Sequence, residues 1–159
     1  MRTRLVVIVT AALLLMVALA APAVAQTDKP LNCVVKMATG VEGAPDWYGT
    51  IRGDINGMIG FSEQQEGALN TVSGTTEHFL ESWTIWVGGD TISGVDEGVW
   101  SFVNFKFRAN GVVTNATGDW AYLVGYRFHE LGVTSPFDPV LGEPWPITAD
   151  GLQLRLMAP

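Results

Sequence analysis

Glu81 is the side chain whose setting in this sequence best suits chemistry. It lies in the segment Thr76–Val87, which alternates in period two, so Glu81 shares a face with Phe79 and Trp83. That face is the more apolar of the two and is expected to point inward. Removal of a carboxylate from water raises its pKa, and a raised pKa suits a general acid or base. The alternative is that Glu81 lies near the mouth of the fold, where it is solvated or paired with an arginine.

A pocket around Glu81 would take its other walls from neighbouring strands. The segments Gly98–Ala109 and Val112–Phe128 also alternate and carry large apolar side chains. We therefore predict a ligand cavity lined by Phe79, Glu81, Trp83, Val103, Phe105, Tyr122 and Tyr126. The two tyrosine hydroxyls could orient a ligand, although aromatic stripes more often form ordinary core.

Motifs for metal, cofactor or nucleophile chemistry are missing from the sequence. His78 and His129 are the only histidines, and their spacing predicts no metal site. Glycine-rich phosphate loops, serine elbows and Cys–His pairs are absent, so no cofactor is expected. Cys33 is the single cysteine and cannot form an internal disulfide. It fits a small buried apolar residue, with an intermolecular disulfide as the alternative.

The first 25 residues have the pattern of a cleavable signal peptide. Arg2 and Arg4 precede the apolar run Leu5–Ala20, and Ala23-Val24-Ala25 forms a small-x-small cleavage site before Gln26. The alternative is a retained membrane anchor, because a spanning helix needs about 20 residues. The cleavage site favours export, so we expect a secreted or periplasmic protein in which residues 26–159 form a single domain.

The charge balance excludes several classes of partner. Of the nine Lys and Arg residues, Arg2 and Arg4 leave with the leader, while all 16 Asp and Glu residues remain, so the formal charge changes from −7 to about −9. An acidic surface repels nucleic-acid phosphates and anionic lipids. We expect no nucleic-acid partner and no stable membrane insertion after cleavage.

Short alternating segments separated by turn residues predict an all-β domain. The predicted strands are Leu31–Ala38, Trp47–Ile55, Met58–Ser62, Thr76–Val87, Gly98–Ala109, Val112–Phe128 and Gly151–Met157. Asn56-Gly57 and Asn110-Gly111 are expected to form tight hairpin turns. The proline-rich stretch Ser135–Ala149 is expected to be a surface loop, and helix is limited to a turn near Ser62–Leu69.

Closure of these strands into a barrel is the expected architecture. About eight antiparallel strands with no helices to cover a flat sheet favour a meander that closes and so removes its edges. A barrel of about eight strands holds only packed side chains or one small ligand. A calycin-like barrel is the alternative fold.

The segment Trp120–Phe128 is apolar on both faces when read as a strand. A strand with one wet face would not have this composition. A second subunit could cover the outer face, or aromatic residues could line a ligand cavity. The first possibility predicts a homo-oligomer.

Two segments carry a family resemblance. Gly111-Val112-Val113-Thr114-Asn115-Ala116-Thr117-Gly118, continuing to Gly125, resembles a strand–turn–strand pattern of allene oxide cyclase and dirigent-type barrels, and Trp47-Tyr48-Gly49-Thr50-Ile51-Arg52-Gly53 resembles an early strand of them. The resemblance implies an eight-stranded barrel with an apolar pocket, often trimeric. The catalytic polar residues of those families have no counterparts at matching positions, so no catalytic role is implied.

Two functions follow from these observations. The first is an exported barrel that binds a small apolar ligand or acts as an interaction module. The second is a cyclase or isomerase in which Glu81 and the tyrosines shape the pocket. Binding is favoured over catalysis because the polar set is sparse and a fold alone does not confer activity.

Overall fold

A computed structural model describes residues 29–64, 71–138, 141 and 143–159 of the chain. The predicted signal peptide, residues 1–25, lies outside the described residues. So does most of the predicted helical turn near Ser62–Leu69, although Ser62 and Glu63 themselves belong to a strand.

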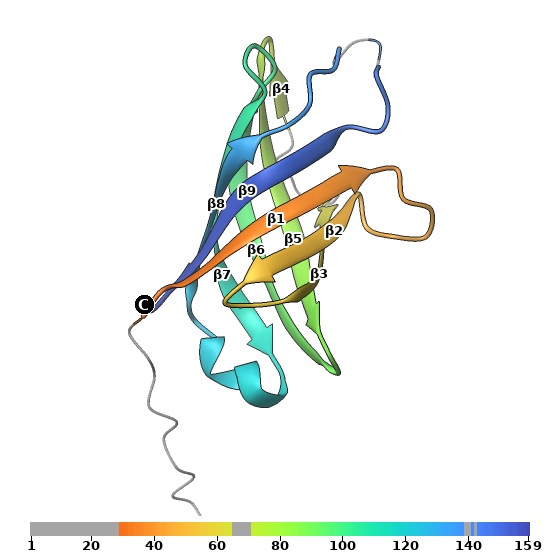
Figure 1. The fold of residues 1–159 in the computed structure, drawn as a ribbon. Coiled ribbons are helices and arrows are strands. Elements are labelled where there is room, and N and C mark those ends of the chain that lie inside the picture. Colours follow the sequence, from red (N-terminus) through yellow and green to blue (C-terminus); the bar gives the residue numbers. More distant parts are fainter. Residues whose placement is uncertain (1–28, 65–70, 139–140, 142) are drawn as a thin grey trace, which may run out of the picture.

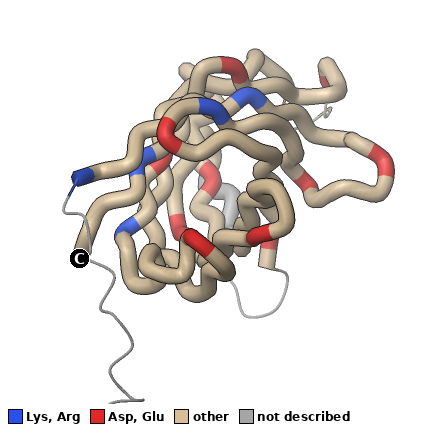
Figure 2. Tube along the Cα trace, turned by 60° about the horizontal axis from the view of Figure 1, so that its bottom comes forward, with Lys and Arg blue, Asp and Glu red and all other residues tan. Residues whose placement is uncertain are grey.

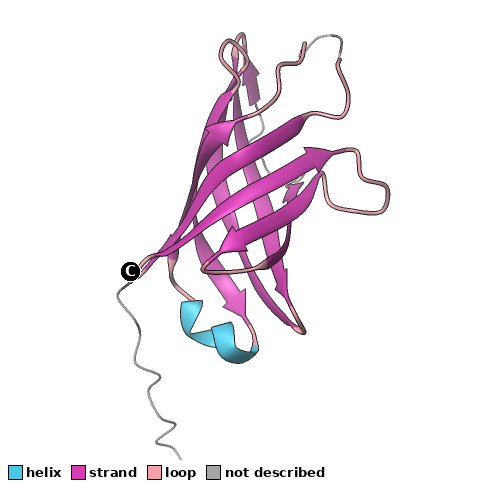
Figure 3. Ribbon diagram, viewed as in Figure 1, coloured by secondary structure: helices cyan, strands magenta, loops and turns pink. Residues whose placement is uncertain are grey.

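Eight long strands close into an antiparallel barrel (Figures 1 and 3). The elements are β1 (Leu31–Thr39), β2 (Trp47–Gly53), β3 (Gly57–Glu63), β4 (Thr71–Ser73), β5 (Thr76–Val87), β6 (Asp90–Ser101), β7 (Lys106–Ala116), the 3₁₀-helix η1 (Gly118–Leu123), β8 (Arg127–Val133) and β9 (Thr148–Met157). Strands β5 to β9 and β1 to β3 are two meanders joined by the pairing of β9 with β1, and β3 closes the ring on β5. The short β4 pairs with β5 beside the ring.

The all-β class and the closed meander barrel are thus confirmed. Strand β5 has the predicted bounds, and β1 and β9 match the predicted first and closing strands within a few residues. The alternation of apolar and polar residues predicted these strands best, because one face of each strand is buried and the other is solvated. In β9, for example, Leu152, Leu154 and Leu156 are fully buried and the residues between them are exposed.

The predicted turn at Asn110-Gly111 is wrong, because both residues lie in the middle of β7. Asn110 faces outward, where its Oδ1 lies 2.8 Å from Nδ1 of His129 on β8. The chain reverses between β6 and β7 instead, at residues 102–105, where Phe105 has a φ of 57°. Side chains stabilise this turn: Lys106 donates its backbone N–H to Asn104 Oδ1 at 3.1 Å. The predicted strand Gly98–Ala109 is therefore divided between two strands.

The predicted strand over Trp120–Phe128 is also wrong. Gly118, with a φ of +54°, starts the helix η1, and β8 begins only at Arg127. Leu123, Tyr126 and Phe128 are all buried within the chain's own core. These three apolar side chains are therefore used inside the barrel, whereas Val124 is 50% exposed, and the homo-oligomer stays a prediction.

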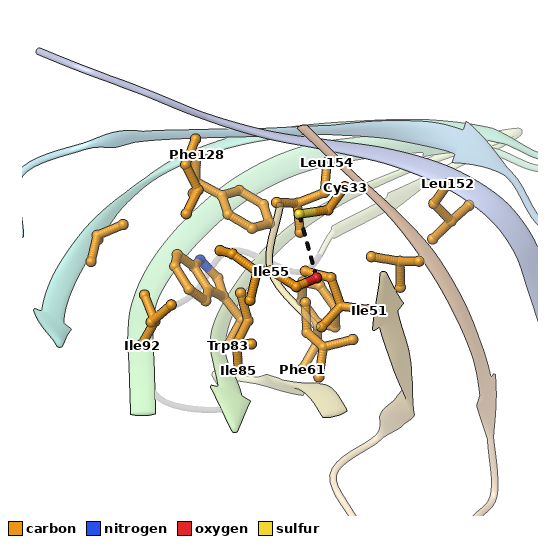
Figure 4. Packing of buried hydrophobic residues seen from close by; sticks show 14 of the residues in the cluster. Cys33, Ile51, Ile55, Phe61, Trp83, Ile85, Ile92, Phe128, Leu152 and Leu154 are labelled. Atoms are coloured by element: carbon orange, nitrogen blue, oxygen red, sulfur yellow. Dashed lines mark hydrogen bonds between the residues drawn. The ribbon is translucent and has the colours of Figure 1, made fainter. Parts of the chain in front are cut away.

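Large side chains fill one end of the barrel, which we call the closed end; it is the lower end in Figure 1, beside η1 and the turn between β5 and β6. Trp83 stacks on Phe128 with ring centroids 4.5 Å apart, and Ile55, Ile85 and Ile92 lie around the pair (Figure 4). Gly94, opposite Trp83 on β6, leaves room for the indole ring. Each such aliphatic or aromatic side chain contributes about 1.5–3 kcal/mol on burial, so the closed end supplies much of the stability.

Cys33 is part of this core, as predicted for a small buried residue. It is a free thiol, and Sγ donates to the backbone oxygen of Ile55 at 3.9 Å (Figure 4). Burial raises the pKa of the thiol, so the reactive thiolate form is disfavoured.

Candidate binding site at the mouth of the barrel

Three acidic residues lie side by side across neighbouring strands near the other end of the barrel, which we call the mouth. Glu63 on β3 pairs with Glu81 on β5, and Glu81 pairs with Asp96 on β6. Directly paired residues share a face of the sheet, so these side chains are neighbours. Glu63 is exposed at the rim, whereas Glu81 and Asp96 are buried. Like charges directly opposite one another destabilise a sheet, so this row has an energetic cost to the fold.

A fourth carboxyl group approaches the row from β8. Glu130 is 1% exposed and pairs with Ala109 on β7, and β7 separates β8 from β6. The β7 residue beside Asp96 is Gly111, where an added Cβ would lie only 2.5 Å from the Asp96 Cβ. Small residues on β7 therefore leave the space in which Glu130 and Asp96 interact. We call Glu81, Asp96 and Glu130 the acidic layer.

No cation in the described part of the chain neutralises this layer. The lysines and arginines of this part are all exposed, and the ion pair between Lys36 Nζ and Asp150 Oδ2, at 2.7 Å, lies on the outer surface. Figure 2 shows the excess of acidic over basic positions along the chain. The predicted alternative that Glu81 is paired with an arginine is therefore wrong.

Burial without cations raises the pKa of each carboxyl group in the layer. The pKa of Glu81 is raised well above its usual range by burial, and next by the charge of Asp96. Burial likewise raises the pKa of Glu130, with a further contribution from Asp96, and it raises the pKa of Asp96 to about 8. Nearer the rim, burial and the charge of Glu63 raise the pKa of Glu77 to about 6. Burial thus favours the protonated forms of the carboxyl groups in the layer.

Several polar atoms here have no hydrogen-bond partner among the described residues. They are both carboxyl oxygens of Asp96, Oε1 of Glu130 and Nε1 of Trp83, which lies closer to the closed end than the acidic layer does. A buried polar group without a partner costs about 1–3 kcal/mol. Such groups in a folded protein need an explanation, which can be bound water or a ligand.

Aromatic side chains surround the opening above the acidic layer. Trp47 on β2 and Trp100 on β6 lie edge to face with centroids 5.8 Å apart, and Phe137 packs on Trp100 at 4.9 Å. The indole Nε1 of Trp100 donates to Thr134 Oγ1 at 3.2 Å. Trp100 is therefore held in place from both sides, and the rim is a defined aromatic surface.

A cavity connects the aromatic rim with the acidic layer. Its volume, taken as the space open to the centres of water-sized molecules, is about 40 Å³. Its walls are formed by Met37, Trp47, Glu63, Glu77, Phe79, Glu81, Trp100, Phe107, Glu130 and Thr134. That space holds a few waters, since one water needs about 10–15 Å³. A groove of about 400 Å³ by the same measure adjoins it and shares Trp47, Glu63 and Trp100, with Trp145 and Ile147 on its far side. Small-molecule sites usually span about 300–1,000 Å³, so the groove, not the cavity, could hold the body of a ligand.

The structure brings only part of the predicted site together. Phe79 and Glu81 line the cavity, as predicted, and Trp83 is fully buried in the core below them. Val103 is 68% exposed in the turn between β6 and β7, and Phe105 contacts Phe137 on the outside of the rim. Tyr122 and Tyr126 lie at the closed end, with ring centroids 6.1 Å apart, Tyr122 in η1 and Tyr126 after it.

Most cavity residues are absent from the predicted set, although a signal for some of them exists. Asp96 pairs with Glu81, so it would follow from correct strand bounds for β6. Glu130 alternates with the buried Phe128 along β8, a pattern hidden by the wrong strand over Trp120–Phe128. Trp47 and Trp100 come together only through closure of the ring, which no local pattern encodes.

Two further features of the described residues concern metal ligands and membrane-spanning helices. Among them no three His, Cys, Asp or Glu side chains are arranged to hold a metal ion. The same residues include no helix with the length and apolar character needed to cross a membrane.

Comparisons with known proteins give no relative for this chain: no family model, curated protein or solved structure matches it. The resemblance to allene oxide cyclase and dirigent-type barrels therefore stays a prediction, and function has to be argued from the geometry of the mouth.

Proposed function

We propose that the protein is a binding protein whose ligand lies in the mouth of the barrel. The body of a small molecule would occupy the aromatic groove beside Trp47, Trp100 and Trp145, and its polar end would enter the cavity toward Glu81 and Glu130. The observation that carries this proposal is that the aromatic groove adjoins a cavity lined by the buried Glu130, whose Oε1 has no hydrogen-bond partner among the described residues. A purely structural core would exclude such groups, because their burial costs stability.

Binding of a neutral apolar dye, Nile red, tests this proposal. Its fluorescence on titration with the protein should report a site that Trp100→Ala weakens by about tenfold, because the ring forms part of the groove wall. Trp86→Ala is the matched control, since Trp86 lies on β5 near Tyr48 and lines neither the cavity nor the groove. Equal dye affinity in the two variants would contradict a site at the mouth.

Acid–base catalysis on the bound molecule is the second candidate. Two carboxyl groups of the cavity wall favour it, because burial raises the pKa of Glu77 to about 6 and that of Glu81 well above its usual range, so that a base and an acid face the same space. With an isomerisable substrate, Glu81→Gln should reduce turnover by about 10²–10⁴-fold if Glu81 is the acid or base. Turnover that survives this change would leave binding as the function.

We also propose that the protein acts outside the cytoplasm. The cleavage site before Gln26 supports this, and the intact mass of material recovered from outside the cytoplasm should correspond to a chain beginning near that residue. Recovery of a species that keeps residues 1–25 in the membrane would contradict it.

A further inference from the structure

The charge of the mouth restricts the kind of polar end that a ligand can present. Carboxyl groups face the cavity from several strands: Glu63 from β3, Glu77 and Glu81 from β5 and Glu130 from β8, with Asp96 of β6 behind them and Asp46 in the loop before β2. Among the described residues that line the cavity there is no lysine, arginine or histidine. In their ionised forms the carboxyl groups that line the cavity from β3, β5 and β8 repel an anionic group and attract a positive charge.

The aromatic rim adds a second attraction of the same sign. The face of an indole ring attracts cations within about 6 Å of its centroid, and tryptophan is the strongest residue in this role. Trp47 and Trp100 both line the cavity, with their ring planes at 69° to each other, and they therefore form a corner. The bond from Trp100 to Thr134 and the contact with Phe137 hold this corner in place before any ligand arrives.

We propose that the mouth binds an organic cation, a quaternary or protonated amine, with its charged head at the corner of Trp47 and Trp100 above the acidic layer. This inference rests on the proposed function and specifies its ligand class. The unpartnered Oε1 of Glu130, on a side chain that lines the cavity and is 1% exposed, is the buried group that such a head would neutralise. The aromatic groove would accommodate the rest of the molecule.

A bare metal ion fits this site less well than an amine does. Calcium takes six to eight oxygen ligands and magnesium a near-ideal octahedron, whereas the described acidic residues provide no set of three suited to a metal. An alkylammonium head needs no fixed coordination number and interacts favourably with indole rings, which a hydrated metal ion would not do as well.

Cation binding should be linked to proton release. Burial raises the pKa values of the carboxyl groups of the layer, whereas a positive charge beside them favours their ionised forms. Each proton released on binding passes to the buffer, and the amine keeps its charge. Affinity for a permanently charged amine should therefore rise as the pH rises from 5 to 8, while affinity for a neutral molecule of the same shape should not.

Choline and 3,3-dimethylbutan-1-ol are suitable probes, since they share a shape and differ in charge. Calorimetric titration of the purified protein at pH 7 should show choline binding at least about tenfold more tightly, which corresponds to about 1.4 kcal/mol. Choline affinity should rise by about tenfold between pH 5 and pH 8. Titration in buffers with different ionisation enthalpies should show release of protons.

Two variants localise the effect. Glu77→Gln should weaken the affinity for choline by about tenfold and leave the affinity for the alcohol unchanged, because the substitution removes charge from the cavity wall and keeps the shape of the side chain. Glu97→Gln is the matched control, since Glu97 lies on the outer face of β6 and should not affect either probe. Glu77 is only half-buried, and a far-ultraviolet spectrum and melting curve confirm that the variant folds.

The outcomes separate this inference from the proposed function. The proposal of an organic cation would be overturned by equal affinity for choline and the alcohol. It would also be overturned if choline did not bind while Nile red still bound at Trp100. Either result would leave the proposed binding function intact. Loss of Nile red binding at the mouth would overturn both. Choline affinity that is unaffected by Glu77→Gln would also overturn the proposed site.

Discussion

The two ends of the barrel are built on opposite principles. At the closed end, Trp83, Phe128 and a set of isoleucines and leucines pack into a dry core. At the mouth, the same strands carry Glu63, Glu81 and Asp96 in one row. Only Ser82 separates the stacked Trp83 from the buried Glu81 along β5, so the change from core to acidic layer is abrupt.

This difference shows where stability and function reside in the barrel. Apolar burial at the closed end favours folding, whereas like charges and unpartnered oxygens near the mouth oppose it. Natural proteins keep such unfavourable groups mainly where a function requires them. The contrast is therefore the main reason to place binding at the mouth, and the following predictions test it.

The largest expected effect is the loss of the aromatic stack at the closed end. Trp83→Ala should reduce the free energy of unfolding by about 3–5 kcal/mol, because it removes a fully buried ring and leaves a cavity. Urea unfolding followed by circular dichroism measures this change. Trp86→Ala, on the partly exposed face of β5, should cost less. Equal losses in the two variants would mean that the core is not concentrated inside the closed end.

The acidic layer should make the protein less stable at higher pH. A carboxyl group whose pKa is raised on folding stabilises the folded state fully below its unfolded pKa, about 4, and this contribution is lost as the pH rises through the folded pKa, about 8 for Asp96. The melting temperature should therefore fall by several degrees between pH 5 and pH 8, since about 1 kcal/mol corresponds to ~4 °C for a domain of this size. A melting temperature that rises over this range would contradict the raised pKa values.

Replacement of one buried acid by its neutral counterpart should remove part of that pH dependence. Asp96→Asn should change stability little at pH 5, where the acid is protonated, and should increase the free energy of unfolding by about 1–3 kcal/mol at pH 8. Denaturant unfolding at the two pH values measures both effects. Glu97→Gln, the next residue but on the outer face, should show no such dependence.

The smallest expected effect concerns the outer surface. Lys36→Met breaks the ion pair with Asp150, in which both side chains are about two-thirds exposed (69% and 68%). Exposed pairs contribute less than about 1 kcal/mol, so thermal unfolding should shift only slightly. A large shift would show that surface electrostatics, and not the two ends of the barrel, dominate stability.

Alternation within single strands predicts much of this fold. In β5 and β9 the solvated face and the buried face differ so clearly that the sequence shows which residues point inward, including Glu81. Prediction failed where residues that are typical of turns lie within a strand because of their side-chain size or contacts. Asn110-Gly111 has the composition of a turn, but Gly111 is needed because Asp96 lies against it, and Asn110 contacts His129.

The site was predicted less completely than the fold because it is assembled from distant segments. Glu81 and Phe79 follow from one strand, but Glu130 approaches Asp96 only because β7 carries small residues between β6 and β8. Trp47 and Trp100 meet through the closure of the ring. Register and closure are long-range properties, and local periodicity does not determine them.

The central claim is that the mouth holds buried carboxyl groups that no cation of the described chain pairs with, and that a ligand can therefore use. Titration of the acidic layer tests this claim most directly. Carbon-13 NMR can follow the side-chain carboxyl groups of Glu81, Asp96 and Glu130 from pH 3 to pH 9, with and without choline. We predict that all three titrate above the ordinary value of about 4 in the free protein, and that choline lowers their pKa values. Ordinary pKa values in the free protein, or titration curves that choline does not move, would contradict the account.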